Sequence, residues 1–192
     1  MNSEVQARTV RPYGSWPSEV SVDEVLAAGG SLSELRADGT DLLWLESRPD
    51  EDGRLTVMRL RDDQLTELTP APLAVRTRIF EYGGGGWDVR DNLLVISDDT
   101  ERRLVVIDPE GGQRPLTPAS PDVRFGSLQL HPEHDLVLAV REDHRGGGEA
   151  VSSIVALTLT GDNPDFGRVL VTGADFHGNP RLRLPDDHTA PR

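Results

Sequence analysis

The residues of this sequence that could bind a ligand or line an interface gather at two glycine-rich segments. In the first, "VRTRIFEYGGGGWDV" (75–89), four consecutive glycines follow Glu81 and Tyr82. In the second, "REDHRGGGE" (141–149), three glycines follow a run of charged residues, which are Arg141, Glu142, Asp143 and His144. That charged run could line a face toward another domain. It could equally form the salt bridges that fix an inter-strand loop, and we favour this structural interpretation.

Neither a metal site nor a serine nucleophile is indicated. His131, His134 and Asp135 lie in "HPEHD", a Pro-containing turn that splays its side chains outward, and no further ligand accompanies them. A nucleophile elbow needs the pattern G-x-S-x-G, and no serine here has glycine at both −2 and +2. We therefore expect no catalytic residue, no bound metal and no cofactor.

Composition excludes several function classes. The 192 residues carry 33 acidic and 20 basic side chains, a net charge of −13. Such a chain repels phosphate groups, which argues against nucleic acid and anionic membrane surfaces as partners. No apolar run approaches the length of a membrane span, and the N-terminus lacks the apolar region of a secretory signal. With no cysteine there is no disulfide, so we expect a cytoplasmic location.

Hydrophobic periodicity predicts a short helix followed by an all-β body. Residues 21–28 form the expected helix, with Ser21 as N-cap, Glu24 three residues later and glycines after it. We expect its apolar face to pack against the main body through Val22, Val25 and Leu26. Beyond residue 30 the period becomes two, in strand-length runs separated by turn signals. These runs are 41–47, 54–60, 92–98, 103–109, 135–142 and 151–159.

The strands repeat along the chain. Leu-Thr-Pro occurs at 68–70 and again at 116–118, 48 residues later. Four strands on a period of ~40–50 residues are typical of a β-propeller blade. The expected fold is therefore an all-β partial propeller of about three four-stranded blades plus the start of a fourth. Its expected boundaries are a leader and helix at 1–30, blades at 31–70, 73–118 and 122–173, the start of a fourth blade at 174–182, and a divergent tail at 183–192.

Phosphate-binding motifs do not account for the glycine run at 83–86. A dinucleotide fingerprint would need a third glycine where Asp88 stands, and a P-loop needs a lysine, which the chain lacks. We expect a strand segment near the propeller axis, where blades crowd together and side chains would clash. In the functional alternative, Glu81 and Tyr82 face a central tunnel or a second domain.

Four segments together resemble the N-terminal region of the prolyl oligopeptidase (S9) family. They are "RPYGSWPSEVS", "VRTRIFEYGGGGW", "LAVREDHRGGGEAVSSIVAL" and "VTGADFHGNPRL", and the resemblance spans residues 11–182. The similarity is to the bacterial acylaminoacyl-peptidase-like or dipeptidyl-aminopeptidase-like branch. It implies a two-domain enzyme, in which an N-terminal propeller lies over a C-terminal α/β-hydrolase domain that carries a Ser, Asp and His triad.

The sequence departs from that family pattern at its C-terminal end. After "PRL" the family typically continues into "SPDG" and the second half of a blade, whereas this chain reads "RLPDDHTAPR" and stops. The hydrolase half is absent from these residues. We expect a truncated, interrupted or frame-shifted family member, or a fragment of one.

The resemblance implies a non-catalytic propeller that restricts access, so that peptides but not folded proteins reach the nucleophile. Relatives in the wider family use propeller acids to hold a substrate's amine, although no motif assigns that role to Glu81. The implied partner is the α/β-hydrolase domain. Three alternatives stay open: a free-standing binding module that completes itself by self-association, a decayed and aggregation-prone gene product, and a small enzyme with new chemistry in the tunnel.

Overall fold

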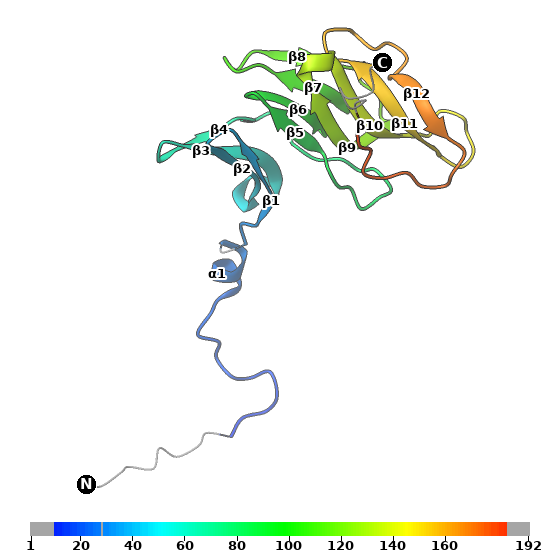
Figure 1. The fold of residues 1–192 in the computed structure, drawn as a ribbon. Coiled ribbons are helices and arrows are strands. Elements are labelled where there is room, and N and C mark those ends of the chain that lie inside the picture. The colour runs from blue at the N-terminus through cyan, green and yellow to red at the C-terminus, as the bar shows by residue number, and fades with distance from the viewer. Residues whose placement is uncertain (1–9, 28, 184–192) are drawn as a thin grey trace, which may run out of the picture.

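Nearly all regular structure in this protein is β. The structure is a computed structural model, and it describes residues 10–27 and 29–183 (Figure 1). In the described residues, one α-helix and two short 3-10 turns accompany twelve strands: α1 (Val22–Ala27), η1 (Pro49–Glu51) and η2 (Pro132–His134). The all-β expectation is confirmed. No helix in this part of the chain is long and apolar enough to cross a membrane.

The strands form three antiparallel four-stranded sheets, each of which follows the order of the chain. The first sheet contains β1 (Leu32–Asp38), β2 (Asp41–Arg48), β3 (Arg54–Arg61) and β4 (Gln64–Glu67). The second contains β5 (Trp87–Arg90), β6 (Leu93–Asp98), β7 (Arg103–Ile107) and β8 (Gln113–Pro115). The third contains β9 (Val123–His131), β10 (Leu136–Asp143), β11 (Val151–Thr158) and β12 (Arg168–Thr172). Three such sheets in succession are consistent with a partial propeller.

Short polar turns join β3 to β4 in the first sheet and β5 to β6 in the second. Asp62 and Asp63 have φ values of 48° and 58°, and Asp91 and Asn92 have 54° and 64°. Two consecutive left-handed residues are the mark of the hairpin turn whose twist matches antiparallel strands, and Asp and Asn tolerate that conformation best after glycine. These acidic tips explain part of the chain's negative charge without implying a ligand.

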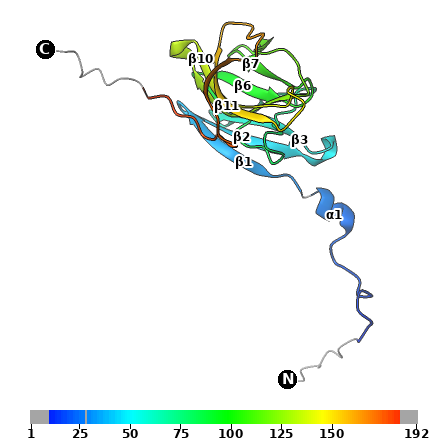
Figure 2. The same cartoon turned by 90° about the vertical axis from the view of Figure 1, so that its right-hand side faces the viewer.

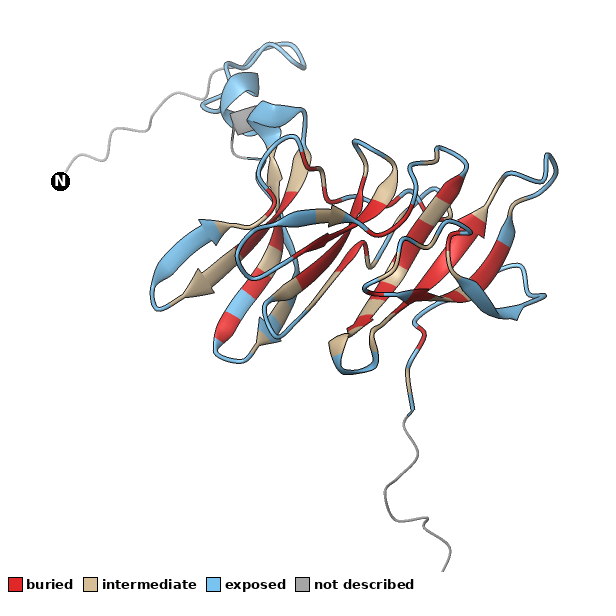
Figure 3. Ribbon diagram, turned by 90° about the horizontal axis from the view of Figure 1, so that it is seen from above, coloured by how far each residue is buried: buried red, intermediate tan, exposed pale blue. Residues whose placement is uncertain are grey.

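The core lies between neighbouring sheets rather than inside any one of them. Buried side chains of the first and second sheets form one cluster, which includes Trp87, whose exposed fraction is 0%. A second cluster joins the second and third sheets and includes Leu130 and Val137. Figure 3 shows these buried residues as red bands on the facing sheets. Each sheet therefore depends on its neighbour for burial of its apolar face.

The Leu-Thr-Pro repeat has a structural cause. The Thr69 hydroxyl accepts the backbone N–H of Val57 at 2.8 Å, and the Thr117 hydroxyl accepts that of Leu104 at 3.0 Å. Both threonines are buried. In both sheets the outer strand ends before this position, so it offers the buried N–H no backbone carbonyl. The threonine hydroxyl accepts that hydrogen bond instead.

One carboxylate connects all three sheets. Asp88, on the inner strand β5, lies 2.9 Å from Arg36 Nη1 of β1 and accepts the Leu130 N–H of β9 at 2.8 Å. The Arg36 guanidinium also lies 4.8 Å from the centre of the Trp87 ring. Because β1, β5 and β9 are each the first strand of a sheet, Asp88 joins the three sheets along their shared inner edge.

Helix α1 begins as expected but does not pack as expected. Ser21 and Glu24 form a reciprocal capping box: Glu24 Oε2 accepts the Ser21 N–H at 2.7 Å and Ser21 Oγ accepts the Glu24 N–H at 3.1 Å. However, Val22 and Val25 are 74% and 60% exposed, and the helix stands apart from the sheets (Figures 1 and 2). The expectation that it packs on the main body is wrong for these two residues, and the Leu26 side chain lies outside the described ones.

The expected strand segment at the glycine run and a strand of the expected fourth blade are not formed. Before the glycine run, only Val75 makes a bridge, to Asp98, and residues 76–86 are turns and loops. After β12 no strand follows within residues 173–183, so the start of a fourth blade is not shown. This last segment turns back across the third sheet (Figure 1), where the His177 ring nitrogen Nδ1 lies 3.0 Å from Ser152 Oγ and Pro180 is buried. The tail at 184–192 lies outside the described residues.

Candidate recognition site at the leader rim

Both glycine-rich segments lie at the same edge of the sheets. Because each sheet is an antiparallel meander, the starts of β1, β5 and β9 share an edge with the β2–β3, β6–β7 and β10–β11 connections. The leader and α1 join the body at this edge, which we call the leader rim (Figure 1). Residues 78–86, hereafter the glycine loop, lie here, and so does the turn at 144–149.

The glycine loop holds an unusual backbone conformation. Phe80 and Glu81 have φ values of 51° and 67°, and Gly83, Gly84 and Gly85 have 76°, 127° and 60°. Left-handed conformations cost energy for residues with a side chain, and they persist only where the surroundings hold them. Here internal hydrogen bonds contribute, from Glu81 N–H to the Arg78 carbonyl at 3.0 Å and from Gly83 N–H to the Ile79 carbonyl at 2.8 Å.

The glycines allow this loop to lie directly against β9. A Cβ on Gly83 would come within 2.7 Å of the Thr77 carbonyl oxygen, and one on Gly85 within 2.7 Å of Ser127 Cα. The Ser127 and Leu128 N–H groups donate to the carbonyls of Gly84 and Gly85, at 3.1 and 3.0 Å. The expectation of crowding at the run is therefore confirmed for Gly83 and Gly85, although the run is a loop docked on a strand and not a strand itself.

Arg124, on β9, contacts two of the six candidate residues named from the sequence, and a third lies beside one of these two. Its Nη1 donates to the Glu81 carboxylate at 2.5 Å and to the Arg78 carbonyl at 3.0 Å, and lies 3.6 Å from Glu142 Oε2. Glu142 in turn accepts the Phe80 N–H at 2.9 Å, and His144 Nε2 lies 3.4 Å from its other oxygen. Sequence reasoning missed Arg124. Its cross-strand register opposite Glu142, which only the fold reveals, brings the two side chains together.

Glu81 is the ionised group of this cluster that faces solvent. The hydrogen bond from Arg124, together with its charge, holds the pKa of the Glu81 carboxyl below its ordinary value. The side chain is nevertheless 78% exposed. A fixed, ionised and accessible carboxylate can accept hydrogen bonds from an ammonium group while one of its oxygens stays on the arginine.

Arg141 and Asp143 point to the opposite face of β10, as alternation along a strand requires. Arg141 is buried against the carbonyls of Asp165 and Phe166, at 3.3 and 3.4 Å, and this burial lowers the pKa of its guanidinium. Asp143 accepts two hydrogen bonds from the Arg145 side chain, at 2.9 and 2.6 Å. The structure therefore separates these two candidates from Glu81 and places them in contacts that hold loops.

Three aromatic rings lie beside the cluster. The centre of the Phe80 ring is 6.1 Å from that of Tyr82 and 5.1 Å from that of Phe176, the latter in an edge-on arrangement. Tyr82 is 81% exposed and Phe176 is 68% exposed. Phe176 belongs to the segment after β12, so residues far apart in the sequence meet at the leader rim.

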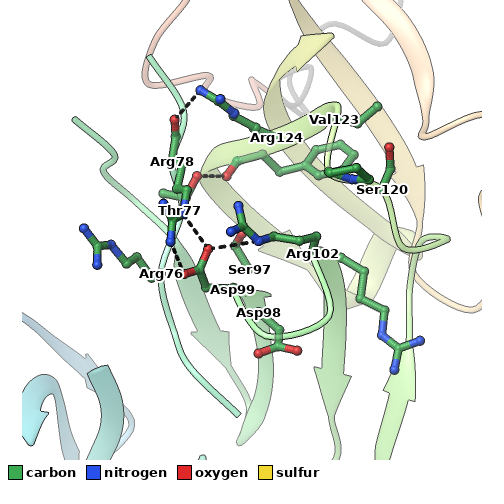
Figure 4. Close-up of a pocket in the computed structure, with 13 residues that line it drawn as sticks. Arg76, Thr77, Arg78, Ser97, Asp98, Asp99, Arg102, Ser120, Val123 and Arg124 are labelled. Atoms are coloured by element: carbon green, nitrogen blue, oxygen red, sulfur yellow. Dashed lines mark hydrogen bonds and ion pairs between the residues drawn. The ribbon is translucent and has the colours of Figure 1, made fainter. Parts of the chain in front are cut away.

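An arginine-rich cavity of about 20 Å³ adjoins the glycine loop (Figure 4). Asp99 accepts two hydrogen bonds from the Arg78 guanidinium, both at 2.9 Å, and lies 3.4 Å from Arg102. The Arg78 hydrogen bonds keep the pKa of Asp99 low. Asp98 accepts the backbone N–H groups of Ala74 and Thr100, at 3.0 and 3.2 Å. These contacts join the connections of the second sheet.

Within the described ranges, no group of three or more His, Asp or Glu could hold a metal ion.

Three solved structures similar to this chain are named for the hydrolysis of puromycin. The chain is 35% identical to a puromycin-hydrolysing peptidase of Mycobacterium tuberculosis, with a TM-score of 0.80 over 91% of this chain and 29% of that one. It is 32% identical to a puromycin hydrolase, with a TM-score of 0.71 over 79% of this chain and 25% of the other. A mutant puromycin hydrolase complexed with PGG gives 30% identity and a TM-score of 0.75, over 84% of this chain and 27% of that one.

The match is long in this chain and short in its relatives. No family model matches the sequence, and no curated protein does. The chain spans between 25% and 29% of the length of the solved structures that it resembles. The four sequence motifs and these structural matches lead to the same assignment: the chain belongs to the prolyl oligopeptidase (S9) family and corresponds to its N-terminal β-propeller region.

Proposed function

We propose that this chain is the non-catalytic propeller portion of an S9-type serine peptidase of the acylaminoacyl-peptidase-like or dipeptidyl-aminopeptidase-like branch. In this role the propeller admits only peptides and small aminoacyl amides to the active site. Its partner is an α/β-hydrolase domain that faces the leader rim. The 192 residues contain no G-x-S-x-G elbow, so these residues alone perform no hydrolysis. A cytoplasmic location fits the lack of cysteine.

The observation that carries this proposal is the position of Glu81. Its carboxylate is ionised, fixed by Arg124 and open to solvent at the rim where the leader enters. The structural relatives are named for the hydrolysis of puromycin, an aminoacyl compound with a free amine. We assign to Glu81 the role of a substrate-recognition residue that binds such an amine.

The experiment has an activity arm and a binding arm, both on the 192-residue chain. We expect no turnover of aminoacyl or acyl-aminoacyl chromogenic amides. In a titration with puromycin followed by ¹H–¹⁵N NMR, we expect resonance shifts at residues 79–86 and 142–144. Glu81→Gln keeps an oxygen for the Arg124 contact but removes the charge, so it should weaken binding about tenfold, as expected for a lost charged hydrogen bond.

The matched control is Glu101→Gln, on the same rim. The Glu101 side chain is 57% exposed and lies 3.9 Å from Arg103, so this variant should bind puromycin as the parent does. Turnover by the parent chain would overturn the non-catalytic assignment. Equal puromycin affinity in the parent and in Glu81→Gln would overturn the recognition role.

Self-association is a second candidate function, favoured by a specific observation. The first and third sheets both carry exposed residues (Figure 3), and some of these residues are apolar. Leu32, Leu35 and Leu42 are exposed on the first sheet, and Val169, Leu170 and Val171 on the last strand of the third. A free-standing module would cover these surfaces with a second copy. Light scattering on the eluting chain distinguishes the two candidates: a single dimeric species would favour the module, and a monomer would exclude it.

A further inference from the structure

A cavity of about 310 Å³ lies where β1, β5 and β9 end, at the edge of the sheets opposite the leader rim. We call this edge the far rim. The cavity is lined by residues of these three inner strands and of the segment after β12. Its polar lining residues are Arg36, Asp88, Arg90, Gln129, His131 and Arg181. A volume of this size is sufficient for a small ligand.

Strand alternation brings the polar side chains of the cavity together. Asp88 and Arg90 are two residues apart on β5, so their side chains leave the strand on the same face. Gln129 and His131 have the same spacing on β9. Arg36 of β1 joins them through its ion pair with Asp88, at 2.9 Å. Three strands from three sheets therefore build one polar wall.

Several donors of this wall have no acceptor within residues 10–27 and 29–183. Arg90 forms no hydrogen bond or ion pair there, and the Arg181 side chain donates to the carbonyl of Pro180, at 2.9 Å. Arg36 Nε and His131 Nε2 are buried atoms without a hydrogen-bond partner in the same part of the chain. A buried donor without an acceptor is costly, so a ligand that brings acceptor oxygens would be stabilised here.

The lining is positively charged, although the chain as a whole carries a net charge of −13. Three arginines face one carboxylate, that of Asp88. Asp88 is already held by Arg36 and by the Leu130 N–H, at 2.9 and 2.8 Å, so its charge is largely offset. The guanidinium groups of Arg90 and Arg181 are left to attract an anion.

Two acidic side chains near the lining limit this positive charge. Glu34 Oε2 lies 3.8 Å from Arg36 Nη2, and Glu133 Oε1 lies 3.7 Å from His131 Nδ1. Both repel a second negative charge on a ligand. The cavity is therefore better suited to a singly charged anion than to a dianion.

We propose that the far-rim cavity binds a carboxylate through the guanidinium groups of Arg90 and Arg181. The planar fork of a guanidinium matches the two oxygens of a carboxylate, and His131 adds a donor when its Nε2 carries the proton. The ligand class is a singly charged carboxylate, from the C-terminus of a peptide or from a free small acid. The site is separate from Glu81, and the inference does not depend on the proposed function.

The test compares N-acetylglycine with N-acetylglycinamide, which differ only in having a carboxylate or an amide at one end. Dissociation constants for the 192-residue chain are measured by ¹H–¹⁵N NMR titration at low salt, where charges are least screened. We expect the acid to bind about tenfold more tightly, because the amide lacks the charge that both guanidinium groups attract. The side-chain resonances of Arg90 and Arg181 should shift with the acid.

Acetate distinguishes the two sources of the carboxylate. If acetate binds more weakly than N-acetylglycine, the cavity also contacts the peptide group, and the ligand is a peptide C-terminus. If the two bind equally, the carboxylate alone is recognised, and the ligand is a free small acid. Both results support the carboxylate site.

Arg90→Gln and Arg181→Gln should each weaken N-acetylglycine binding about threefold, the size of effect of one exposed ionic contact. Both residues are exposed, so neither change should affect folding, and the spectra of the variants check this. The matched control is Arg168→Gln, at the start of β12. It removes the same charge from an exposed arginine outside the cavity and should leave the affinity unchanged.

Four results would overturn the proposal. Equal affinities for the acid and the amide would show that the carboxylate is not recognised. Unchanged affinity in both Arg90→Gln and Arg181→Gln would show that these residues do not bind it. An equal loss in Arg168→Gln would mean that only the net charge of the chain matters. Tighter binding of inorganic phosphate than of N-acetylglycine would show that the cavity prefers a dianion.

Discussion

Two segments of similar composition, the glycine loop and the turn at 144–149, are held by different forces. In the glycine loop, a side chain at Gly83 or Gly85 would collide with backbone atoms 2.7 Å away. In the turn, nothing lies within 4 Å of a Cβ built on Gly146, Gly147 or Gly148. Glycine is thus required in the first segment because backbone atoms approach closely. In the second segment glycine is favoured only at position 147, where φ is 71°.

The difference extends to the arginines that accompany each segment. Arg124 is 21% exposed and ties the glycine loop to β9 through one carboxylate and one carbonyl. Arg145 is 45% exposed and pairs with Asp143, two residues away. The Arg124 contacts join two sheets, whereas the Arg145 ion pair is local, and the Arg145 guanidinium lies 4.7 Å from the centre of the Phe166 ring in the β11–β12 connection of the same sheet. Similar glycine-rich sequences therefore form a contact between sheets in the glycine loop and a solvent-exposed connection in the turn at 144–149.

The largest expected effect is that of Gly85→Ala. The new Cβ would meet Ser127 Cα at 2.7 Å and Ser127 N at 2.9 Å, on a residue with φ of 60°. Since both partners are backbone, we expect the free energy of unfolding to fall by about 2–4 kcal/mol. Urea unfolding followed by circular dichroism measures it. An unchanged midpoint would mean that the loop can leave β9 without cost.

Arg124→Met should have the next largest effect. It removes the hydrogen bonds to Glu81 and Arg78 and leaves the nearby Glu142 carboxylate without its cation. We expect a loss of about 1–3 kcal/mol in the same unfolding measurement. The paired variant Arg145→Met removes a partly exposed ion pair and keeps apolar bulk beside the Phe166 ring, so it should cost less than about 1 kcal/mol. Equal losses would remove the distinction between the two segments.

Acidification should affect the carboxylates of both segments in the same direction. Arg124 lowers the pKa of Glu81, and Arg145 lowers that of Asp143, each chiefly through a hydrogen bond. A folded-state pKa below the unfolded value means that the unfolded chain binds more protons as the pH falls. The stabilisation is therefore complete above the ordinary values of 4.5 and 3.8 and is lost as the pH drops through the folded pKa.

NMR titration of the two side chains makes this result specific to each segment. Arg124→Met should raise the pKa of Glu81 toward 4.5 and leave Asp143 unchanged, and Arg145→Met should do the reverse, toward 3.8. A shift of both groups in either variant would show that the two segments are coupled.

The smallest effect is expected for Gly146→Ala and Gly148→Ala. Neither residue has a left-handed φ, and each would place its new methyl group in open space. We expect changes within about 0.5 kcal/mol of the parent, measured beside Gly85→Ala. A large loss in either variant would show that the turn is packed after all.

The sequence was sufficient for the repeat and for the class of fold. Period-two runs and the recurring Leu-Thr-Pro predicted sheets of four strands, because both signals come from strands and turns that are neighbours in the chain. The capping box of α1 was also predictable, since it needs only Ser21 and Glu24. The packing of that helix was not predictable, because an amphipathic pattern does not identify the surface against which the apolar face packs.

The candidate site was predicted only in part, for a topological reason. Glu81, Glu142 and His144 were identified by their positions beside glycine runs, but Arg124, the common partner of Glu81 and Glu142, lies in a strand with no distinctive motif. Phe176 was missed as a neighbour of Phe80 for the same reason. Contacts between residues far apart in the chain depend on the register of β9 and on the path after β12, which periodicity does not specify.

The docking of the glycine loop on β9 has a consequence for the order of events during protein synthesis. The loop is held in its conformation by hydrogen bonds from Ser127 and Leu128. A ribosome that adds about 5–20 residues per second synthesises these two residues roughly 2–8 s after Gly85. Until then the first two sheets can pack together, but the segment that carries Glu81 and Tyr82 lacks the strand on which it docks. The rim that we assign to substrate recognition is thus completed late, after the third sheet has begun to emerge.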